Sequence, residues 1–300
     1  MQALWMLAAA FFFATMAVCV KFASAWFSSA ELVFYRGLLG MLFMWALARR
    51  QGVTLGTAYP GSHAWRSLVG VVSLGAWFYA LAHLPLATGM TLNYMSSVWV
   101  AVFLIGGALL AWTPRRGAAA PLHQGPLVLT VLAGFSGVVL MLRPTIAQDQ
   151  AFAGLVGLLS GLIAAFAYMQ VMALGRLGEP ETRTVFYFAV GSTVAGLLAM
   201  PITGGISAWS WPHALWLLPV GLFASLGQLC MTRAYSRGAT LVVASFQYSG
   251  IVFGAIYGVL LFGDSLPLTG WLGMGLIIAS GITATALRAR AAPHAPAEEH

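Results

Sequence analysis

The sequence predicts an all-α membrane protein with ten transmembrane helices. Of its 300 residues, 60% are hydrophobic and only 7% are charged, and the mean hydropathy is +0.88. A water-soluble domain of this length needs more charge on its surface, whereas a surface that faces lipid does not. The few basic residues also gather in short connections between apolar segments, as expected of a chain that crosses the bilayer repeatedly.

Taken in order, the first five predicted spans are separated by turn-forming and basic residues. These spans are expected at 3–22, 30–48, 67–84, 87–112 and 126–142, each near the roughly 20 residues that a spanning helix needs. Arg49–Gly52 follows the second span, Pro85 separates the third from the fourth, and Thr113–Arg116 follows the fourth. Proline, glycine and arginine at these points end one helix before the next begins.

The remaining five spans follow the same rule. They are expected at 153–174, 183–201, 213–235, 239–262 and 267–287. Pro201 and Pro267 lie at helix ends, whereas Pro219 lies within the eighth span and predicts a kink there. No soluble domain is inserted between spans. The tail at 291–300, rich in Ala, Pro and Glu, is expected to be disordered.

The basic residues predict the side that each connection faces, because cytoplasmic loops carry an excess of Lys and Arg. With both termini in the cytoplasm, the outer connections hold only Lys21 and Arg143, and Arg36 falls within a span. The inner connections and the tail hold Arg49, Arg50, Arg66, Arg115, Arg116, Arg176, Arg183, Arg233, Arg237, Arg288 and Arg290. This asymmetry favours ten spans and a cytoplasmic location of both termini.

The two halves of the chain share a weak internal repeat. A shift of 154 residues places Asn93 on Gln247 and Tyr94 on Tyr248 within a match that needs no gap. Because each half holds an odd number of spans, the second half must enter the membrane from the opposite side. The predicted units are 1–147 for the first five-helix repeat and 148–290 for the inverted second repeat. Inverted halves around a site at the membrane midplane recur among transporters.

Six short motifs are distributed over residues 3–287. They are Glu31–Gly37, Tyr79–Leu81, Leu84–Ala87, Ala234–Tyr235, Ala244–Tyr248 and Leu260–Asp264. Together they resemble the motifs of the drug/metabolite transporter superfamily, EamA type. The first half departs from the pattern at Ala111–Pro114, where the family has a Gly-Glu pair, so that helix end is expected to be held differently.

The resemblance implies a central cavity between the halves, lined mainly by helices 1, 3, 4, 6, 8 and 9. Within the family, the sequence is similar to bacterial amino-acid exporters of the YddG type, which favour aromatic and other neutral amino acids. It therefore implies an inner-membrane exporter of such amino acids that works by alternating access, as a facilitator or exchanger. Another small metabolite is the alternative cargo.

Neutral polar and aromatic residues on the expected cavity helices are the candidate substrate-binding residues. They are Trp77, Tyr79, His83, Asn93, Tyr94, Ser97, Trp99, Tyr168, Gln228, Ser245, Gln247 and Tyr248. Amides and hydroxyls pair with the ammonium and carboxylate of a zwitterion, and rings stack on an aromatic side chain or contact an ammonium. The alternative is structural, with the amides bonded between helices and the rings in packing or interfacial positions.

Arg36 is the candidate charge anchor, because an ionisable group within a span is a functional hypothesis by default. It would bind a substrate carboxylate through paired hydrogen bonds. The alternative is that Arg36 pairs with Glu31 or extends toward the interface and fixes the packing of the second helix.

The missing residue types exclude other functions. No Asp or Glu lies near the middle of a predicted span, so no proton relay is expected and transport down a gradient is the simpler mechanism. The sequence holds no catalytic constellation, so an intramembrane enzyme is not expected.

Neither a cofactor nor a metal is expected, because no Cys/His spacing suits one, and Cys19 and Cys230 lie in apolar runs. The net charge of +7 forms no single patch that would bind nucleic acid. The expected partners are an amino-acid substrate and the lipid bilayer, with the chain as a monomer.

Overall fold

The computed structural model describes residues 2–111, 125–142, 150–203, 205–208, 210–263, 265 and 267–291. Over these residues every regular element is helical, as predicted. The elements are α1 (Gln2–Ala23), α2 (Ser29–Gln51), α3 (Pro60–His83), α4 (Leu86–Tyr94), α5 (Ser96–Ala111), α6 (Gly125–Leu142), α7 (Ala151–Arg176), α8 (Glu181–Ala199), the 3₁₀ helix η4 (Met200–Ile202), α9 (Trp211–Ala214), α10 (Leu217–Arg237), α11 (Thr240–Gln247), α12 (Ser249–Phe262) and α13 (Leu268–Ala291). Apart from Ala291, the predicted tail lies outside the described residues, as does the predicted repeat boundary at 147–148.

Within the described residues, seven helical stretches are long and apolar enough to cross a membrane. They are Leu4–Ala23, Ser29–Gln51, Pro60–His83, Ala151–Arg176, Glu181–Ile202, Trp211–Arg237 and Thr240–Phe262. Their length and composition define a multi-pass membrane protein. The described parts of α6 and α13 contribute shorter apolar stretches, Val128–Gly137 and Leu268–Ser280. The count of ten spans and their inverted arrangement stay predictions.

The start of α3 differs from the predicted third span. The helix begins at Pro60 rather than at residue 67, because proline suits the first helical turn, where its missing N–H would be unpaired in any case. The charged side chain of Arg66 lowers the hydropathy of these first turns and hides them from a search for apolar runs. Arg66 was expected in a cytoplasmic connection, and this is wrong: it lies within α3 and is 2% exposed.

Glu31 holds the N-terminal end of α2. Its carboxylate accepts a hydrogen bond from the Ser28 backbone N–H, and its own N–H donates to the Ser28 hydroxyl, which together form a capping box. The Ser207 backbone N–H and hydroxyl also donate to this carboxylate, at 2.8 and 2.6 Å. The predicted alternative that Arg36 pairs with Glu31 is therefore wrong, since these serine donors occupy the carboxylate.

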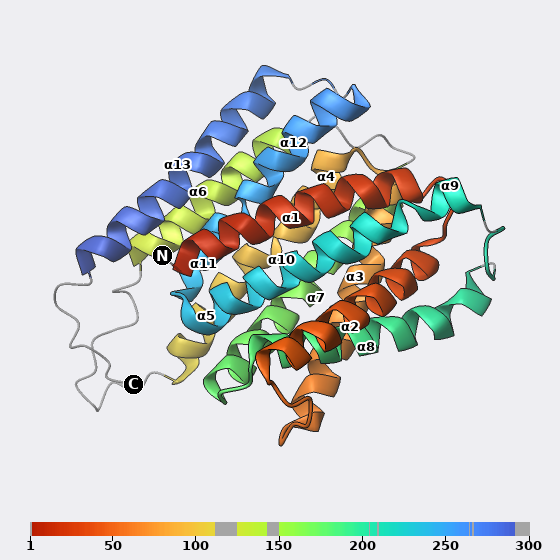
Figure 1. Cartoon of the computed structure of the whole chain (residues 1–300). Helices are drawn as coiled ribbons and strands as arrows, with labels where there is room; N and C mark the ends of the chain where they lie inside the picture. Colours follow the sequence, from red (N-terminus) through yellow and green to blue (C-terminus); the bar gives the residue numbers. More distant parts are fainter. Residues whose placement is uncertain are drawn as a thin grey trace.

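The helices form one bundle in which neighbours come from distant parts of the sequence (Figure 1). The α6 helix lies beside α13 at one side, and α2 lies beside α8 at the other. The α1 helix packs along α10, and α3 along α7. Glycine permits close approach of α2 and α8, because a Cβ at Gly37 would lie 2.5 Å from the Thr193 backbone nitrogen. Small residues allow such contacts between membrane helices.

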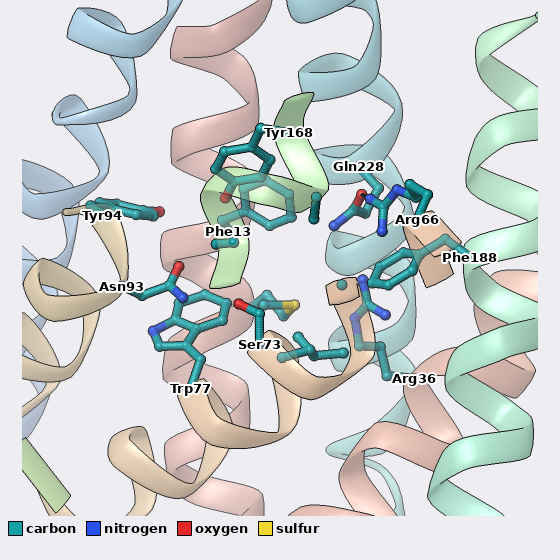
Figure 2. A pocket seen from close by; sticks show the side chains of 15 residues that line it. Phe13, Arg36, Arg66, Ser73, Trp77, Asn93, Tyr94, Tyr168, Phe188 and Gln228 are labelled. Carbon is teal, nitrogen blue, oxygen red and sulfur yellow. Dashed lines mark hydrogen bonds between the residues drawn. The ribbon is translucent and has the colours of Figure 1, made fainter. Parts of the chain in front are cut away.

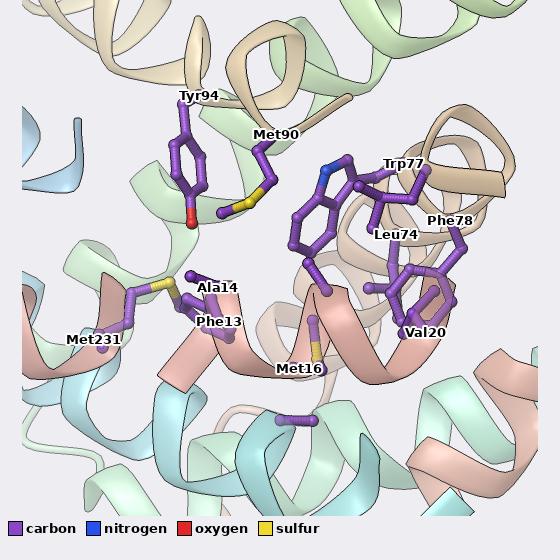
Figure 3. Packing of buried hydrophobic residues seen from close by; sticks show 14 of the residues in the cluster. Phe13, Ala14, Met16, Val20, Leu74, Trp77, Phe78, Met90, Tyr94 and Met231 are labelled. Carbon is purple, nitrogen blue, oxygen red and sulfur yellow. The ribbon is translucent and has the colours of Figure 1, made fainter. Parts of the chain in front are cut away.

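The apolar core lies where α1 meets α3 and α4 (Figure 3). Phe13 and Met16 of α1 are buried with Trp77 of α3 and with Met90 and Tyr94 of α4. The irregular shapes between the rings are filled by methionine, whose unbranched side chain adapts to them. This packing fixes α3 and α4 against α1 and limits the positions that the Trp77 and Tyr94 rings can adopt.

Two predicted spans are each divided into two helices. The fourth becomes α4 and α5 with a break at Met95, and the ninth becomes α11 and α12 with a break at Tyr248. The backbone tightens at both breaks, where Val98 N donates to Met95 O and Tyr248 N donates to Ser245 O, three residues back in each case. The internal repeat matches Tyr94 with Tyr248, so the two breaks fall at nearly equivalent positions. Discontinuous helices of this kind surround the substrate sites of many transporters.

A polar cluster joins the α2–α3 connection to the α7–α8 connection at one end of the bundle. The Glu179 carboxylate accepts from the Thr57 hydroxyl at 3.0 Å, lies 3.1 Å from His63 Nε2, and accepts from Arg183 Nη1 at 3.1 and 3.2 Å. Burial opposes the charged form of Glu179, but these partners outweigh it and hold the pKa of the carboxyl below its ordinary value. Glu179, Thr57, His63 and Arg183 are called the Glu179 cluster below.

Candidate functional site

A cavity of about 50 Å³ lies at the meeting point of seven helices, α1, α2, α3, α4, α7, α8 and α10. A space of this size holds a few water molecules, so a metabolite enters only when the surrounding helices separate. The residues that line it are Phe13, Met16, Arg36, Arg66, Gly70, Ser73, Leu74, Trp77, Asn93, Tyr94, Ala164, Ala167, Tyr168, Phe188 and Gln228. The family resemblance did not include the second and seventh predicted spans, which are α2 and α8, among the main cavity helices, yet each contributes to this lining.

The two ends of the cavity differ in chemistry (Figure 2). Arg36, Arg66 and Gln228 lie at one end, around the ring of Phe188. Trp77, Asn93 and Tyr94 lie at the other end, and Phe13, Ser73 and Tyr168 lie between the two groups. The cavity is therefore cationic at the end formed by α2, α3, α8 and α10, and aromatic at the end formed by α3 and α4.

Arg66 dominates the cationic end. Its Nη2 donates to Gln228 Oε1 at 3.1 Å, and its guanidinium lies 3.8 Å from the centre of the Phe188 ring. Its Nε and Nη1 are buried and have no hydrogen-bond partner among the described residues. Gly70, one turn further along α3, leaves room for this group, because a Cβ there would overlap Arg66 Nη1 and lie 2.8 Å from Phe188 Cε2.

Arg36 approaches the same aromatic ring from α2. Its Nη1 donates to the Ser192 hydroxyl at 3.2 Å, and its guanidinium lies 4.9 Å from the centre of the Phe188 ring. Its Nε is buried without a partner. Phe188 thus contacts both arginines, and the ring face partly offsets the loss of water around each cation.

Five other predicted binding residues line the cavity. Trp77 donates from Nε1 to Gly89 O at 3.1 Å, and Asn93 Nδ2 donates to the Ser160 hydroxyl at 3.0 Å. The Tyr94 hydroxyl is buried and has no hydrogen-bond partner. Gln228 accepts from Arg66 as described above, and Tyr168 reaches the cavity from α7. Of this group, only the Tyr94 hydroxyl is left wholly without a partner.

Gln247 and Ser97 lie outside the cavity lining, in a separate hydrogen-bond network. Gln247 Oε1 accepts from the hydroxyls of Ser97 and Tyr235, and its Nε2 donates to those of Ser96 and Tyr168. With four partners the amide has no donor or acceptor left for a solute, which favours the structural interpretation for Gln247. Its bond to Tyr168 connects this network to the cavity.

The remaining predicted residues lie elsewhere. His83 is exposed and stacks on Tyr79, with ring centres 4.2 Å apart, outside the cavity lining. Trp99 stacks on Phe103, and Ser245 lines a separate apolar pocket of about 230 Å³ near α13. Tyr248 is 0% exposed and packs near Gly134 of α6. The structure does not bring these residues together with the arginines.

Sequence reasoning missed Arg66, Phe188, Ser73 and Phe13 as cavity residues. The available signal for Arg66 was its position four residues before Gly70, which places both on one helix face, with Pro60 as a helix start before them. Phe188 carried no signal, since one phenylalanine in an apolar helix resembles any other. Ser73 and Phe13 were equally inconspicuous.

A multi-pass helical bundle that encloses a buried polar cavity beside discontinuous helices is the architecture of a membrane transporter. The chain belongs to the EamA-like transporter family, whose family model matches residues 1–106 and 151–285. The resemblance to EamA-type drug/metabolite transporters is thereby confirmed, whereas the similarity to YddG-type amino-acid exporters stays a prediction.

Similar proteins transport different solutes. The pseudopaline exporter CntI of Pseudomonas aeruginosa is 34% identical over 87% of this chain and 89% of its own length. A riboflavin transporter of Rhizobium johnstonii is 27% identical over 93% of this chain and 89% of its own length. A solved crystal structure matches with a TM-score of 0.75 over 97% of this chain and 98% of that chain; at 17% identity it shows the fold alone.

Proposed function

We propose that this chain exports a small metabolite across the bacterial inner membrane by alternating access between two inverted five-helix repeats. The observation that carries the proposal is the buried cavity, which takes side chains from both predicted repeats. In this proposal the chain works as a monomer. Both termini face the cytoplasm, as the distribution of arginine favours.

Reciprocal helix pairing supports the inverted repeat. The first span of the first half, α1, packs on the third span of the second half, α10. The third span of the first half, α3, packs in turn on the first span of the second half, α7. The second spans of the two halves, α2 and α8, also pair, as do the fifth spans, α6 and α13. A pseudo-two-fold axis between the halves generates this set of contacts, and the family model matches one segment on each side of the predicted boundary.

The cargo in this proposal carries a carboxylate. The arginines provide donors for it, and the rings of Trp77, Tyr94 and Tyr168 provide surfaces for an apolar or aromatic portion. Neutral aromatic amino acids are the first candidates on these grounds. The second arginine favours another metabolite with more negative charge, and the relatives named for pseudopaline and riboflavin fit a family with varied cargo.

Transport runs as facilitated diffusion or exchange. Three carboxylates are present in the described part of the chain, and none of them lines the cavity: Glu31 caps α2, Glu179 belongs to its cluster, and Glu181 pairs with Arg237. The proposed cycle therefore has no acidic side chain in the cavity to carry a proton.

Counterflow in proteoliposomes tests the proposal. Purified protein should exchange radiolabelled tryptophan, phenylalanine or methionine, or a wider panel of small organic acids, at the same rate with and without a pH gradient. Asn93→Ala and Tyr94→Ala should slow exchange, because both side chains line the cavity. An absence of flux for the whole panel would refute the transport function, and flux of other metabolites alone would refute the amino-acid cargo.

A further inference from the structure

The cationic end of the cavity holds two buried arginines, and no carboxylate of the described residues lies beside them. Arg36 is 3% exposed and Arg66 is 2% exposed, and both contact the ring of Phe188. Two like charges held against one ring repel each other strongly in a medium of low dielectric constant. Buried charges in proteins are ordinarily paired, so this pair requires an explanation.

The three carboxylates of the described residues are all used elsewhere. Serine donors occupy Glu31, the Glu179 cluster occupies Glu179, and Arg237 lies 2.6 Å from Glu181 Oε1. The neutral partners of the arginines are Ser192 and Gln228, which accept one hydrogen bond each. They leave Arg36 Nε and two nitrogens of Arg66 without acceptors.

We propose that the cargo supplies the missing counter-charge, and that it is an organic dianion with an aromatic or apolar portion. This inference rests on the proposed transport function and names the class of its substrate, a dianion in place of a neutral aromatic amino acid. The anionic oxygens, from two carboxylates or from one phosphate, bind the unpartnered nitrogens of Arg36 and Arg66, and the apolar portion extends toward Trp77 and Tyr94 (Figure 2). Carboxylate and phosphate both suit guanidinium donors.

The arrangement distinguishes a dianion from a neutral amino acid. The carboxylate of an amino acid neutralises one arginine, and its ammonium adds a positive charge to a cavity that already holds two. The lining offers no carboxylate to receive that ammonium among the described residues. The aromatic rings provide cation–π contacts at the opposite end, but these are weaker than a charged pair.

A charge series built on one phenyl ring tests this inference. The probes are phenylsuccinate and phenyl phosphate as dianions, 3-phenylpropionate as a monoanion, phenylalanine with no net charge, and phenylalaninamide as a cation. Binding to the full-length protein in detergent is measured by isothermal titration calorimetry at constant pH. Both dianions should bind at least about tenfold more tightly than the monoanion, since a hydrogen bond to a charged group contributes that much or more. Phenylalanine and phenylalaninamide should bind more weakly still.

Substitutions test whether Arg36 and Arg66 cause the preference for dianions. Arg36→Gln and Arg66→Gln should each weaken phenylsuccinate binding about ten- to a hundredfold and leave phenylalanine binding little changed. Arg49→Gln is the matched control, because it removes the same charge from an exposed position over the Trp45 ring. If a glutamine variant does not fold, Arg66→Lys retains the charge with fewer donors and should weaken binding of the dianions less.

The outcomes separate this inference from the proposed function. Phenylalanine binding as tightly as phenylsuccinate, dianion affinity unchanged in both cavity variants, or no binding of any anionic probe would each overturn the dianion assignment. A preference for phenyl phosphate over phenylsuccinate would support the dianion assignment and identify phosphate as the acidic group. Counterflow of neutral solutes would still support the transport function if the dianion assignment failed. Absence of all flux would refute the transport function, even if the dianions bound as expected.

Discussion

At the scale of single residues, the cationic end depends on a glycine as much as on the arginines. Gly70 lies one turn after Arg66 on α3, and the guanidinium occupies the space that a side chain at residue 70 would fill. The same absence of a side chain lets the Phe188 ring approach α3 from α8. Arg66 is thus held between the helix backbone and an aromatic face, which fixes the direction of its unpartnered nitrogens.

Gly70→Ala should destabilise the protein by about 1–3 kcal/mol, as expected when a side chain is forced into a packed interior, and should weaken phenylsuccinate binding. Gly75→Ala on the same helix is the control. A Cβ at Gly75 meets nothing within 4 Å, and alanine favours a helix by up to about 1 kcal/mol over glycine. Thermal unfolding in detergent compares the two variants; equal melting temperatures would contradict the packing described for Arg66.

Residue type decided which cavity residues the sequence revealed. Arg36 and Asn93 were identified because a charged or amide side chain in an apolar run is conspicuous. Arg66 was missed because it lies near a helix start, where arginine is also the ordinary residue of a cytoplasmic loop. Gln247 is equally conspicuous in the sequence, but its four hydrogen bonds favour a structural role, and a sequence does not show whether an amide is saturated.

At the scale of elements, the Glu179 cluster ties α2, α3, α7 and α8 together at one end of the bundle. Thr54 and Leu55 in the α2–α3 connection add to it, through their carbonyl oxygens, which accept from Arg183 Nε and from the Tyr187 hydroxyl. Any motion that separates α3 from α8 at this end must break these bonds. The cluster is therefore placed to resist separation of these helices at this end.

The Glu179 cluster should make stability depend on pH in the acid range. Because the folded-state pKa of Glu179 is depressed, its stabilisation is complete above the unfolded value of about 4.3 and is lost as the pH falls through the lower folded value. Glu179→Gln should therefore lower stability by about 1–3 kcal/mol at pH 7 and by progressively less toward acid. Thermal unfolding between pH 7 and pH 3.5 measures the difference.

Glu181→Gln is the control for that experiment. Glu181 lies two residues further on and pairs with Arg237, whose side chain is 51% exposed, and such surface pairs contribute about 0–1 kcal/mol. A Glu181 variant as unstable as the Glu179 variant, or a Glu179 effect that does not change with pH, would show that the Glu179 cluster does not hold these helices.

Hydropathy predicted the position of helices better than their continuity. Apolar runs located every helical stretch that the structure assigns as a candidate span, because bilayer thickness sets the length of an apolar helix. The breaks at Met95 and Tyr248 were not predicted, since they depend on three-residue hydrogen bonds and not on apolar composition. The first turns of α3 were missed because they carry His63 and Arg66.

At the scale of the whole molecule, the cavity lies between helices that the predicted repeat would relate to one another. The pairs α1–α10 and α3–α7 exchange under that repeat, and both contribute to the lining. A space of about 50 Å³ is closed to a metabolite, so transport in this account requires the pairs to separate at one end and then at the other. The sequence indicated the repeat through a nearly constant offset, but the pairing of helices and the chemistry of the cavity needed coordinates.

The most direct test of alternating access is chemical labelling of a cysteine in the cavity. Ser73→Cys, in a background with Cys19→Ala and Cys230→Ala, places one thiol in the lining. Oriented membrane vesicles are treated with a membrane-impermeant thiol reagent from each side in separate experiments. Alternating access predicts that this cysteine is labelled from both sides and that a transported solute protects it from both. Labelling from only one side or from neither, in a variant that still transports, would contradict it.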